Sequence, residues 1–163
     1  MMNKHNLHSS TRQVPTGQFK AHGQVDIQME GDLLHYIATG PFNKELVDCL
    51  AVAQLNFLQT AQPTGAWVSI CTMRESAVTS PEGLARYNEI MRTPKPAGLT
   101  PVATAFVVGP EVEGGKLMAP HYAKIYADIG RPFQTFATMA EAQLWAQAMI
   151  NLANEKSVGQ EPD

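Results

Sequence analysis

The densest group of hydroxyl and charged side chains lies in the segment TMRESAVTSPEG, residues 72 to 83. This segment follows an apolar stretch predicted to be a buried strand, and it ends at a predicted helix N-terminus, where backbone N–H groups favour an anion. Ligands of open α/β sheets also gather beyond the carboxyl ends of strands. The segment therefore predicts an anion-binding or partner-binding site at Arg74, Ser76, Thr79, Ser80 and Glu82. The alternative is that Ser80 only caps its helix and that Arg74 is solvated.

A second candidate site is an apolar pocket. The chain has eight methionines, whose flexible side chains suit adaptable pockets, and two tyrosines, Tyr122 and Tyr126, lie at helical spacing in a predicted helix. These tyrosines are the predicted pocket residues. Trp145 is predicted to be a core residue instead. It lies on a helical stripe that would face the sheet together with Leu144, Ala148, Met149 and Leu152.

No recognised catalytic pattern is visible. The chain has no G-x-S-x-G nucleophile motif, and its histidines do not have zinc-binding spacing. Cys49 and Cys71 lie in apolar segments, which predicts buried free thiols. The loop GPEVEGGK departs from a phosphate-binding loop because Gly115 stands where the lysine is needed. We therefore predict no catalytic residue, metal or cofactor, while an enzyme of unrecognised type stays open as an alternative.

Length and composition favour one domain. The chain has 163 residues, of which 44% are hydrophobic, and a net charge of -3. It shows no basic cluster typical of nucleic-acid binding, no apolar run long enough to span a bilayer, and no signal peptide at its N-terminus. These features predict a cytoplasmic protein without a nucleic-acid partner. Residues 1 to 23 and 154 to 163 lack apolar periodicity and are predicted to be flexible or disordered tails.

Residues 24 to 153 carry the pattern of a single α/β domain. An alternating segment from Val25 and the apolar segment LLHYIAT flank Gly31-Asp32, which predicts an antiparallel hairpin. Helices are predicted after Asn43, after Ser80 and after Thr138, three residues that suit N-caps, and a short one around Tyr122. Strands are predicted at AWVSICTM, VATAFVVG and PFQTF. The predicted fold is an open mixed sheet of four to five strands, antiparallel at its start and then mostly parallel, flanked by helices.

The element order, the segment GPFNKE and the closing segment FQTFATMAEAQLWA resemble the SpoIIAA-like branch of the STAS superfamily, which is related to CRAL-TRIO lipid-transfer domains. The resemblance covers about residues 24 to 153. It implies a small module that acts through a protein partner, by a phosphoserine switch, or that binds an apolar ligand. The switch motif has a serine where this chain has Glu82, in the stretch Ser80-Pro81-Glu82-Gly83-Leu84. The resemblance therefore predicts that this chain does not use that switch, and Thr79 and Ser80 are the only nearby hydroxyls.

Three functions follow as hypotheses. The first is a non-enzymatic regulatory or protein-interaction module, for which the loop at residues 74 to 83 is the predicted surface. The second is a carrier or sensor of a small apolar, lipid-like ligand. The third is an enzyme of unrecognised type. The sequence leaves open the identity of the partner or ligand, and whether the chain forms a homodimer.

Overall fold

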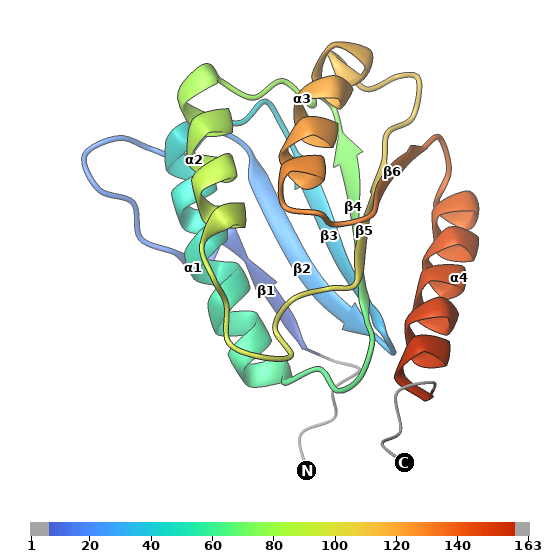
Figure 1. Cartoon of the computed structure of the whole chain (residues 1–163). Coiled ribbons are helices and arrows are strands. Elements are labelled where there is room, and N and C mark those ends of the chain that lie inside the picture. The colour runs from blue at the N-terminus through green and yellow to red at the C-terminus, as the bar shows by residue number, and fades with distance from the viewer. Residues whose placement is uncertain (1–6, 159–163) are drawn as a thin grey trace.

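A computed structural model of the chain describes residues 7–158, and these form one sheet of six strands with four α-helices and a 3-10 helix (Figure 1). The elements in chain order are β1 (His8–Ser10), η2 (Thr11–Gln13), β2 (Gln24–Glu30), β3 (Leu33–Thr39), α1 (Lys44–Ala61), β4 (Val68–Arg74), α2 (Pro81–Arg92), β5 (Ala103–Val107), α3 (Gly115–Asp128), β6 (Phe133–Phe136) and α4 (Met139–Val158).

The strands lie side by side in the order in which they occur in the sequence, from β1 to β6. The first three strands pair antiparallel, and β3, β4, β5 and β6 pair in parallel. This arrangement confirms the predicted α/β class, the N-terminal hairpin and the parallel strands that follow it. The predicted number of strands is too low by one, because β1 was not expected.

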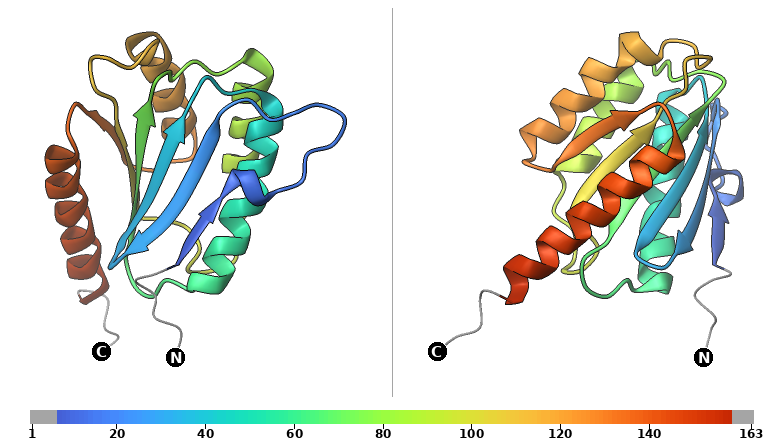
Figure 2. Two further views of the ribbon diagram at one scale, coloured as in Figure 1. Left: turned by 180° about the vertical axis from the view of Figure 1, so that it is seen from behind. Right: turned by 90° about the vertical axis from the view of Figure 1, so that its right-hand side faces the viewer.

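The helices divide unequally between the two faces of the sheet. Each parallel connection passes through one helix, and Figures 1 and 2 show α1, α2 and α3 together on one face and α4 alone on the other. The contacts of α4 are with β4, β5 and β6. Ion pairs join the neighbouring helices of the three-helix layer: Arg86 with Asp48 at 2.7 Å, and Arg92 with Asp128 at 3.3 Å.

The N-terminal segment corrects the sequence analysis. Residues 1 to 23 were expected to be a flexible tail, but His8–Ser10 pair with Gln28, Ile27 and Asp26 of β2. The hydroxyl of Thr11 is buried and accepts a hydrogen bond from the Val25 backbone N–H at 3.0 Å. A three-residue strand is too short to produce a readable alternation, which is why the pattern missed it. Residues 1–6 of the expected tail lie outside the described residues.

The predicted helix starts are confirmed by their caps. The Asn43 side chain accepts a hydrogen bond from the Leu46 N–H at 3.0 Å. Ser80 accepts one from the Gly83 N–H at 3.1 Å, with Pro81 as the first residue of α2. Each bond satisfies an N–H group that has no partner within its own helix.

The last helix is longer than expected and presents a different face. It continues to Val158, so residues 154–158 are helical and not part of a disordered tail; residues 159–163 lie outside the described residues. Its buried residues are Ala142, Ala146 and Ile150. The predicted stripe is therefore displaced: Leu144 is 77% exposed, Leu152 is 44% exposed and Ala148 is also exposed, while Trp145 and Met149 are half-buried against the sheet.

Two hydrophobic cores result, one on each face. The larger core lies under α1, α2 and α3 and contains most of the aromatic side chains. The smaller core lies under α4 and consists of Val, Ile and Ala residues of β4, β5 and α4. Among the described residues, no helix has both the length and the hydropathy that a membrane span requires.

Candidate functional site

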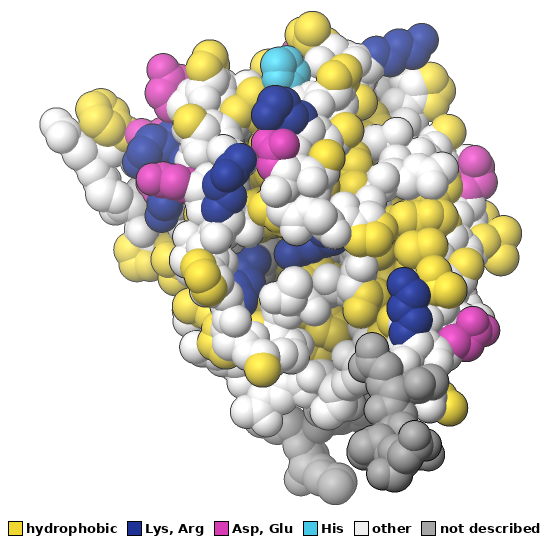
Figure 3. Space-filling view, viewed as in Figure 1, with side chains coloured by type: hydrophobic (Ala, Val, Ile, Leu, Met, Phe, Trp, Pro, Cys, Tyr) yellow, Lys and Arg dark blue, Asp and Glu magenta, His cyan; other side chains and the backbone are white. Residues whose placement is uncertain are grey.

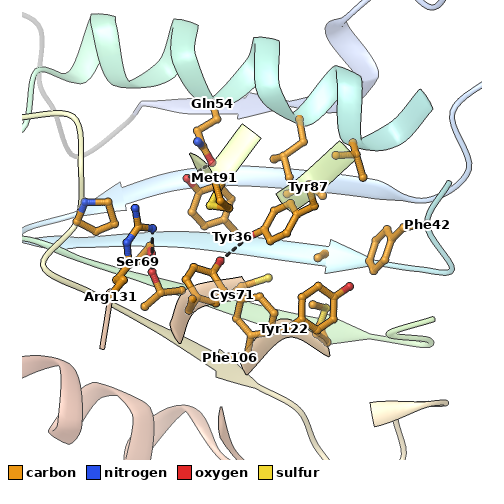
Figure 4. A pocket seen from close by; sticks show the side chains of 18 of the residues that line it. Tyr36, Phe42, Gln54, Ser69, Cys71, Tyr87, Met91, Phe106, Tyr122 and Arg131 are labelled. Atoms are coloured by element: carbon orange, nitrogen blue, oxygen red, sulfur yellow. Dashed lines mark hydrogen bonds between the residues drawn. The ribbon is translucent and has the colours of Figure 1, made fainter. Parts of the chain in front are cut away.

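A cavity of about 70 Å³ lies within the larger core, between the sheet and the three-helix layer (Figure 4). Side chains from β2, β3, β4 and β5 form its floor, and α1, α2 and α3 form its roof. Figure 4 shows Tyr36, Cys71 and Phe106 rising from the strands, with Gln54 and Tyr87 pointing toward them from the helices. Phe42 lies at one end of the pocket, and Arg131 lies beside Ser69 at the other.

The two-residue period of the strands explains which side chains reach the cavity. Along β4 the residues Ser69, Cys71 and Met73 line it, while the alternate residues Val68 and Ile70 belong to the core under α4. Successive side chains of a strand point to opposite faces, so the same strand supplies both layers. The nearly continuous run of apolar and small residues from Val68 to Met73 therefore supplies two different surfaces.

All four tyrosines of the chain line the cavity: Tyr36, Tyr87, Tyr122 and Tyr126. The rings of Tyr87, Tyr122 and Tyr126 are in contact, partly through Phe106, whose centroid lies 5.0 Å from that of Tyr122 in an edge-to-face arrangement. Edge-to-face pairs stabilise such clusters beyond the area that they bury. Packed aromatic rings therefore form much of the cavity wall.

Each tyrosine hydroxyl already has a hydrogen-bond partner. Tyr36 donates to the Gln54 side-chain oxygen at 2.9 Å, Tyr122 bonds to the Thr79 hydroxyl, and Tyr87 bonds to Tyr126. The hydroxyls of Ser69 and Thr104 bond to each other at 2.8 Å in the floor. The hydroxyl groups of the cavity wall thus have hydrogen-bond partners within the wall, and the surface that remains for a ligand there is apolar.

Burial controls the ionisation of these groups. Burial raises the pKa of Tyr122 to about 12 and raises that of Tyr36 and Tyr87 well above the ordinary value. Burial also raises the pKa of the Cys71 thiol to about 12, so this cysteine is protonated at neutral pH. A protonated thiol is a poor nucleophile. Cys49 and Cys71 are free thiols, as the sequence predicted.

The cavity ends at four residues that also line a hollow on the surface. Met91, Lys95, Pro101 and Arg131 border the cavity on one side and a surface hollow of about 500 Å³ on the other. We call these four residues the mouth. Figure 3 shows basic side chains set into the recessed middle of this face of the molecule.

The mouth is held in place by the loop between α2 and β5. The indole N–H of the buried Trp67 donates to the Gly98 carbonyl at 3.0 Å, and the Leu99 side chain is buried in the larger core. Gly98 has a φ of 83°, a backbone conformation that favours glycine. The loop that carries Lys95 is thereby anchored at its centre.

Two cations lie at the mouth without acidic partners. Neither Lys95 nor Arg131 has an ion pair with any residue between 7 and 158. Arg131 is placed over the Tyr126 ring, 5.6 Å from its centroid, and makes a long contact of 3.4 Å with the Thr104 hydroxyl. Burial, and to a lesser extent the charge of Arg131, lowers the pKa of Lys95 to about 8.

The loop at residues 74 to 83, which was predicted from the sequence as a binding site, is held by backbone hydrogen bonds. The Phe42 N–H donates to the Val78 carbonyl at 2.8 Å, and the Ala77 N–H donates to the Glu113 carbonyl at 2.8 Å, so the segment is tied to two neighbouring segments. At Gly40 an added Cβ would lie 2.1 Å from the Ser76 carbonyl oxygen. Glycine is required there for the close approach of the two backbones.

The five predicted loop residues do not converge on one surface. Arg74 and Glu82 are exposed. Ser76 is buried, accepts from the Val78 N–H at 3.2 Å and lies 3.4 Å from a Glu113 carboxylate oxygen. Ser80 caps α2, which is the alternative that the sequence left open for it. Thr79 lines the cavity through its bond to Tyr122, so the two sites predicted separately meet at this pair.

The sequence analysis named two residues of the pocket and missed the others. Tyr122 and Tyr126 both line the cavity. Lys95 was missed because the proline-rich segment around it was interpreted only as the end of a helix. Arg131 was missed because it lies in a short connection. The sequence does contain one signal for Lys95 and Arg131: each is a cation next to proline and near apolar residues.

Residues 7–158 include no group of three or more His, Cys, Asp and Glu side chains that could hold a metal ion. Comparison of the chain with family models, with curated proteins and with solved structures gave no match.

Proposed function

We propose that this chain binds a small apolar molecule in the cavity between the sheet and the three-helix layer, as a carrier or sensor. The observation that carries the proposal is an apolar space inside the larger core whose hydroxyl and amide groups are paired with one another. Well-packed cores contain few voids larger than a water molecule. An apolar cavity bordered by a surface hollow is the usual form of a ligand site.

The size of the cavity limits the ligand. A cavity of about 70 Å³ is roughly half the volume of the engineered cavity of about 150 Å³ that admits benzene. The space therefore fits a short apolar chain of a few carbon atoms, and a long acyl chain would require the helices to move apart. The proposal accordingly narrows the lipid-like ligand of the sequence analysis to a small molecule.

The regulatory-module hypothesis stays a prediction. Its surface was to be the loop at residues 74 to 83, where Thr79 is buried and Ser80 is engaged as a helix cap. These positions support the expectation that neither hydroxyl acts as a phosphate acceptor. The ligand-binding proposal needs no partner protein and no catalytic residue.

The test is to identify any small molecule that copurifies with the chain. The full chain is purified from its own cells and extracted with organic solvent, and the extract is compared by mass spectrometry with that of the variant Cys71→Leu. Cys71 lies in the floor of the cavity, so leucine fills space there. We expect one small compound from the natural chain that is absent from the variant.

A second measurement makes the test decisive when the ligand is lost during purification. Xenon under pressure enters apolar cavities, and it should shift the NMR signals of residues around the cavity in the natural chain and not in Cys71→Leu. Identical extracts together with an absent xenon response would contradict the proposal. A folded Cys71→Leu, shown by its thermal unfolding, is the control.

A further inference from the structure

The mouth contains features that an uncharged apolar ligand would not need. Within the cavity, the hydroxyl groups are already paired, so a polar end of a ligand would find no free partner there. At the mouth, Lys95 and Arg131 carry charges without an acidic partner in the described part of the chain. A ligand with an apolar body and a polar end would therefore place its apolar body in the cavity and its polar end at the mouth.

We propose that the mouth binds the anionic end group of the ligand, and that the ligand is a short apolar carboxylic acid whose carboxylate contacts Lys95 and Arg131. This inference rests on the proposed function, because it places the apolar body in the cavity. An unpaired cation placed against an apolar wall costs stability, and such groups cluster at binding sites.

The local backbone favours a carboxylate over a phosphate. Phosphate groups are commonly bound by several backbone N–H groups, as at helix N-termini. Around the mouth, Pro94, Pro96, Pro101 and Pro132 have no N–H to donate. A carboxylate has only two oxygens, and a guanidinium and an ammonium can satisfy both.

The other charges near the mouth are already neutralised. Arg92 and Asp128 line the surface hollow, where Asp128 pairs with Arg92 at 3.3 Å and with Lys124 at 2.9 Å. Inside the cavity, Cys71 and the tyrosines are the only other titratable groups among the lining residues, and burial keeps them protonated at neutral pH. Lys95 and Arg131 are thus the charges left for an anion.

The test uses acids and their uncharged amides as paired probes. Butanoate, pentanoate and hexanoate are titrated into the isotope-labelled chain at pH 7, each beside its amide, and dissociation constants are taken from NMR chemical shifts. We expect the best acid to bind at least about tenfold more tightly than its amide, because charge-assisted hydrogen bonds are the stronger class. Lys95→Met and Arg131→Met should each remove most of that difference between acid and amide.

Arg92→Gln is the matched control, because it removes one positive charge from the same hollow at a residue that already has an acidic partner. The pH dependence adds a second readout. Between pH 7 and pH 9.5 the acid should bind more weakly as Lys95 loses its proton, while the amide should not change. In Lys95→Arg, acid binding should stay constant over this range.

The possible outcomes separate the two proposals. Equal binding of acid and amide would overturn the anion site and leave the apolar pocket in place. Binding of neither probe would count against both. An equal loss in Arg92→Gln and Lys95→Met would show a general effect of surface charge, and would also overturn the inference.

Discussion

The two faces of the central strands are built from the same segments and packed in opposite ways. Under α4, Val68, Ile70 and Ala105 meet the alanines of the helix, and all of these side chains are almost fully buried. Under the three-helix layer, the alternate positions carry Cys71 and Phe106 against tyrosine rings, and a cavity remains. Small aliphatic side chains let a helix lie directly on the strands. Rings joined by their hydroxyls cannot collapse into the space between them.

This difference separates a close-packed face from a face that contains a cavity. The side chains at the centre of the face under α4 are almost fully buried, and its role is to hold the strands together. The face under the three-helix layer retains unfilled volume, which forfeits dispersion contacts and therefore lowers stability. Substitutions that change side-chain volume should consequently have different effects on the two faces.

The largest expected effect is the removal of volume from the close-packed face. Ile70→Ala should lower the free energy of unfolding by about 4 kcal/mol, because Ile70 is fully buried and α4 cannot follow the shortened side chain. Met91→Ala on the other face should cost about 2 kcal/mol, since that side chain already borders open space. Urea denaturation of both variants measures the difference, and equal losses would remove the contrast between the faces.

The second largest effect is expected when a larger side chain is introduced on each of the two faces. Ala105→Leu forces extra atoms under α4 and should cost about 2 to 3 kcal/mol. Cys71→Leu, on the face of the neighbouring strand β4 that borders the cavity, should cost less than about 1 kcal/mol because the space for the larger side chain exists. Denaturation midpoints measured side by side decide this. A larger loss in Cys71→Leu would show that the cavity is not available to a side chain.

Trp145 tests how far the packing under α4 extends toward solvent. The ring is half-buried and lies 5.7 Å from the ring of Phe136, centroid to centroid. Trp145→Ala should therefore cost about 2 kcal/mol, below the range of 3 to 5 kcal/mol expected for a fully buried tryptophan. Leu144→Ala, on an exposed neighbour, is the control and should leave the thermal unfolding temperature almost unchanged.

The smallest effect concerns the cation at the mouth. The folded chain releases the Lys95 proton near pH 8, while the unfolded chain keeps it to about the ordinary value of 10.5. Because the unfolded state binds more protons between these values, stability from this group rises with pH across this window. Lys95→Met should therefore be more stable than the natural chain at pH 7, by less than about 1 kcal/mol because solvent screens the ammonium.

The advantage of Lys95→Met should shrink as the pH increases from 8 to 10. Above pH 10 the buried tyrosines lower the stability of both chains alike, because they hold protons that the unfolded chain has released, and this effect cancels in the difference between the chains. The measurement is the difference between the two unfolding curves at each pH. An advantage that did not change with pH would show that Lys95 has the same pKa in the folded and in the unfolded chain.

Most of the fold could be predicted from local patterns. The hairpin has a two-residue alternation, and the starts of α1 and α2 have the side chains of N-caps, so each element carried its own signal. β1 could not be found in this way because three residues are too few for a period. The face of α4 was also misjudged. The buried residues of α4 include the alanines Ala142 and Ala146, whose small side chains give a weak hydrophobic signal. The larger residues around Leu144 gave a stronger signal, so the prediction placed an exposed side of the helix against the sheet.

The candidate site was less predictable than the fold. It depends on residues from seven elements and on the loop that carries Lys95, and none of these has a spacing that a motif could describe. Tyr122 and Tyr126 could be named because they share a helix. Tyr36 and Tyr87 join them only through the folded topology. The resemblance to SpoIIAA-like STAS domains stays a prediction, since the α/β class agrees with it but is shared by many other families.

The two tryptophans of the chain lie on opposite sides of the sheet. Trp67 is in the wall of the cavity, and Trp145 packs in the layer under α4. The emission of an indole depends on the polarity of its surroundings, so the molecule contains one optical reporter for each layer. A chain that keeps only Trp67, with Trp145→Phe, would report events in the cavity alone. Its counterpart with Trp67→Phe would report the closing of the last helix over the strands, so the two layers could be followed separately as the chain folds.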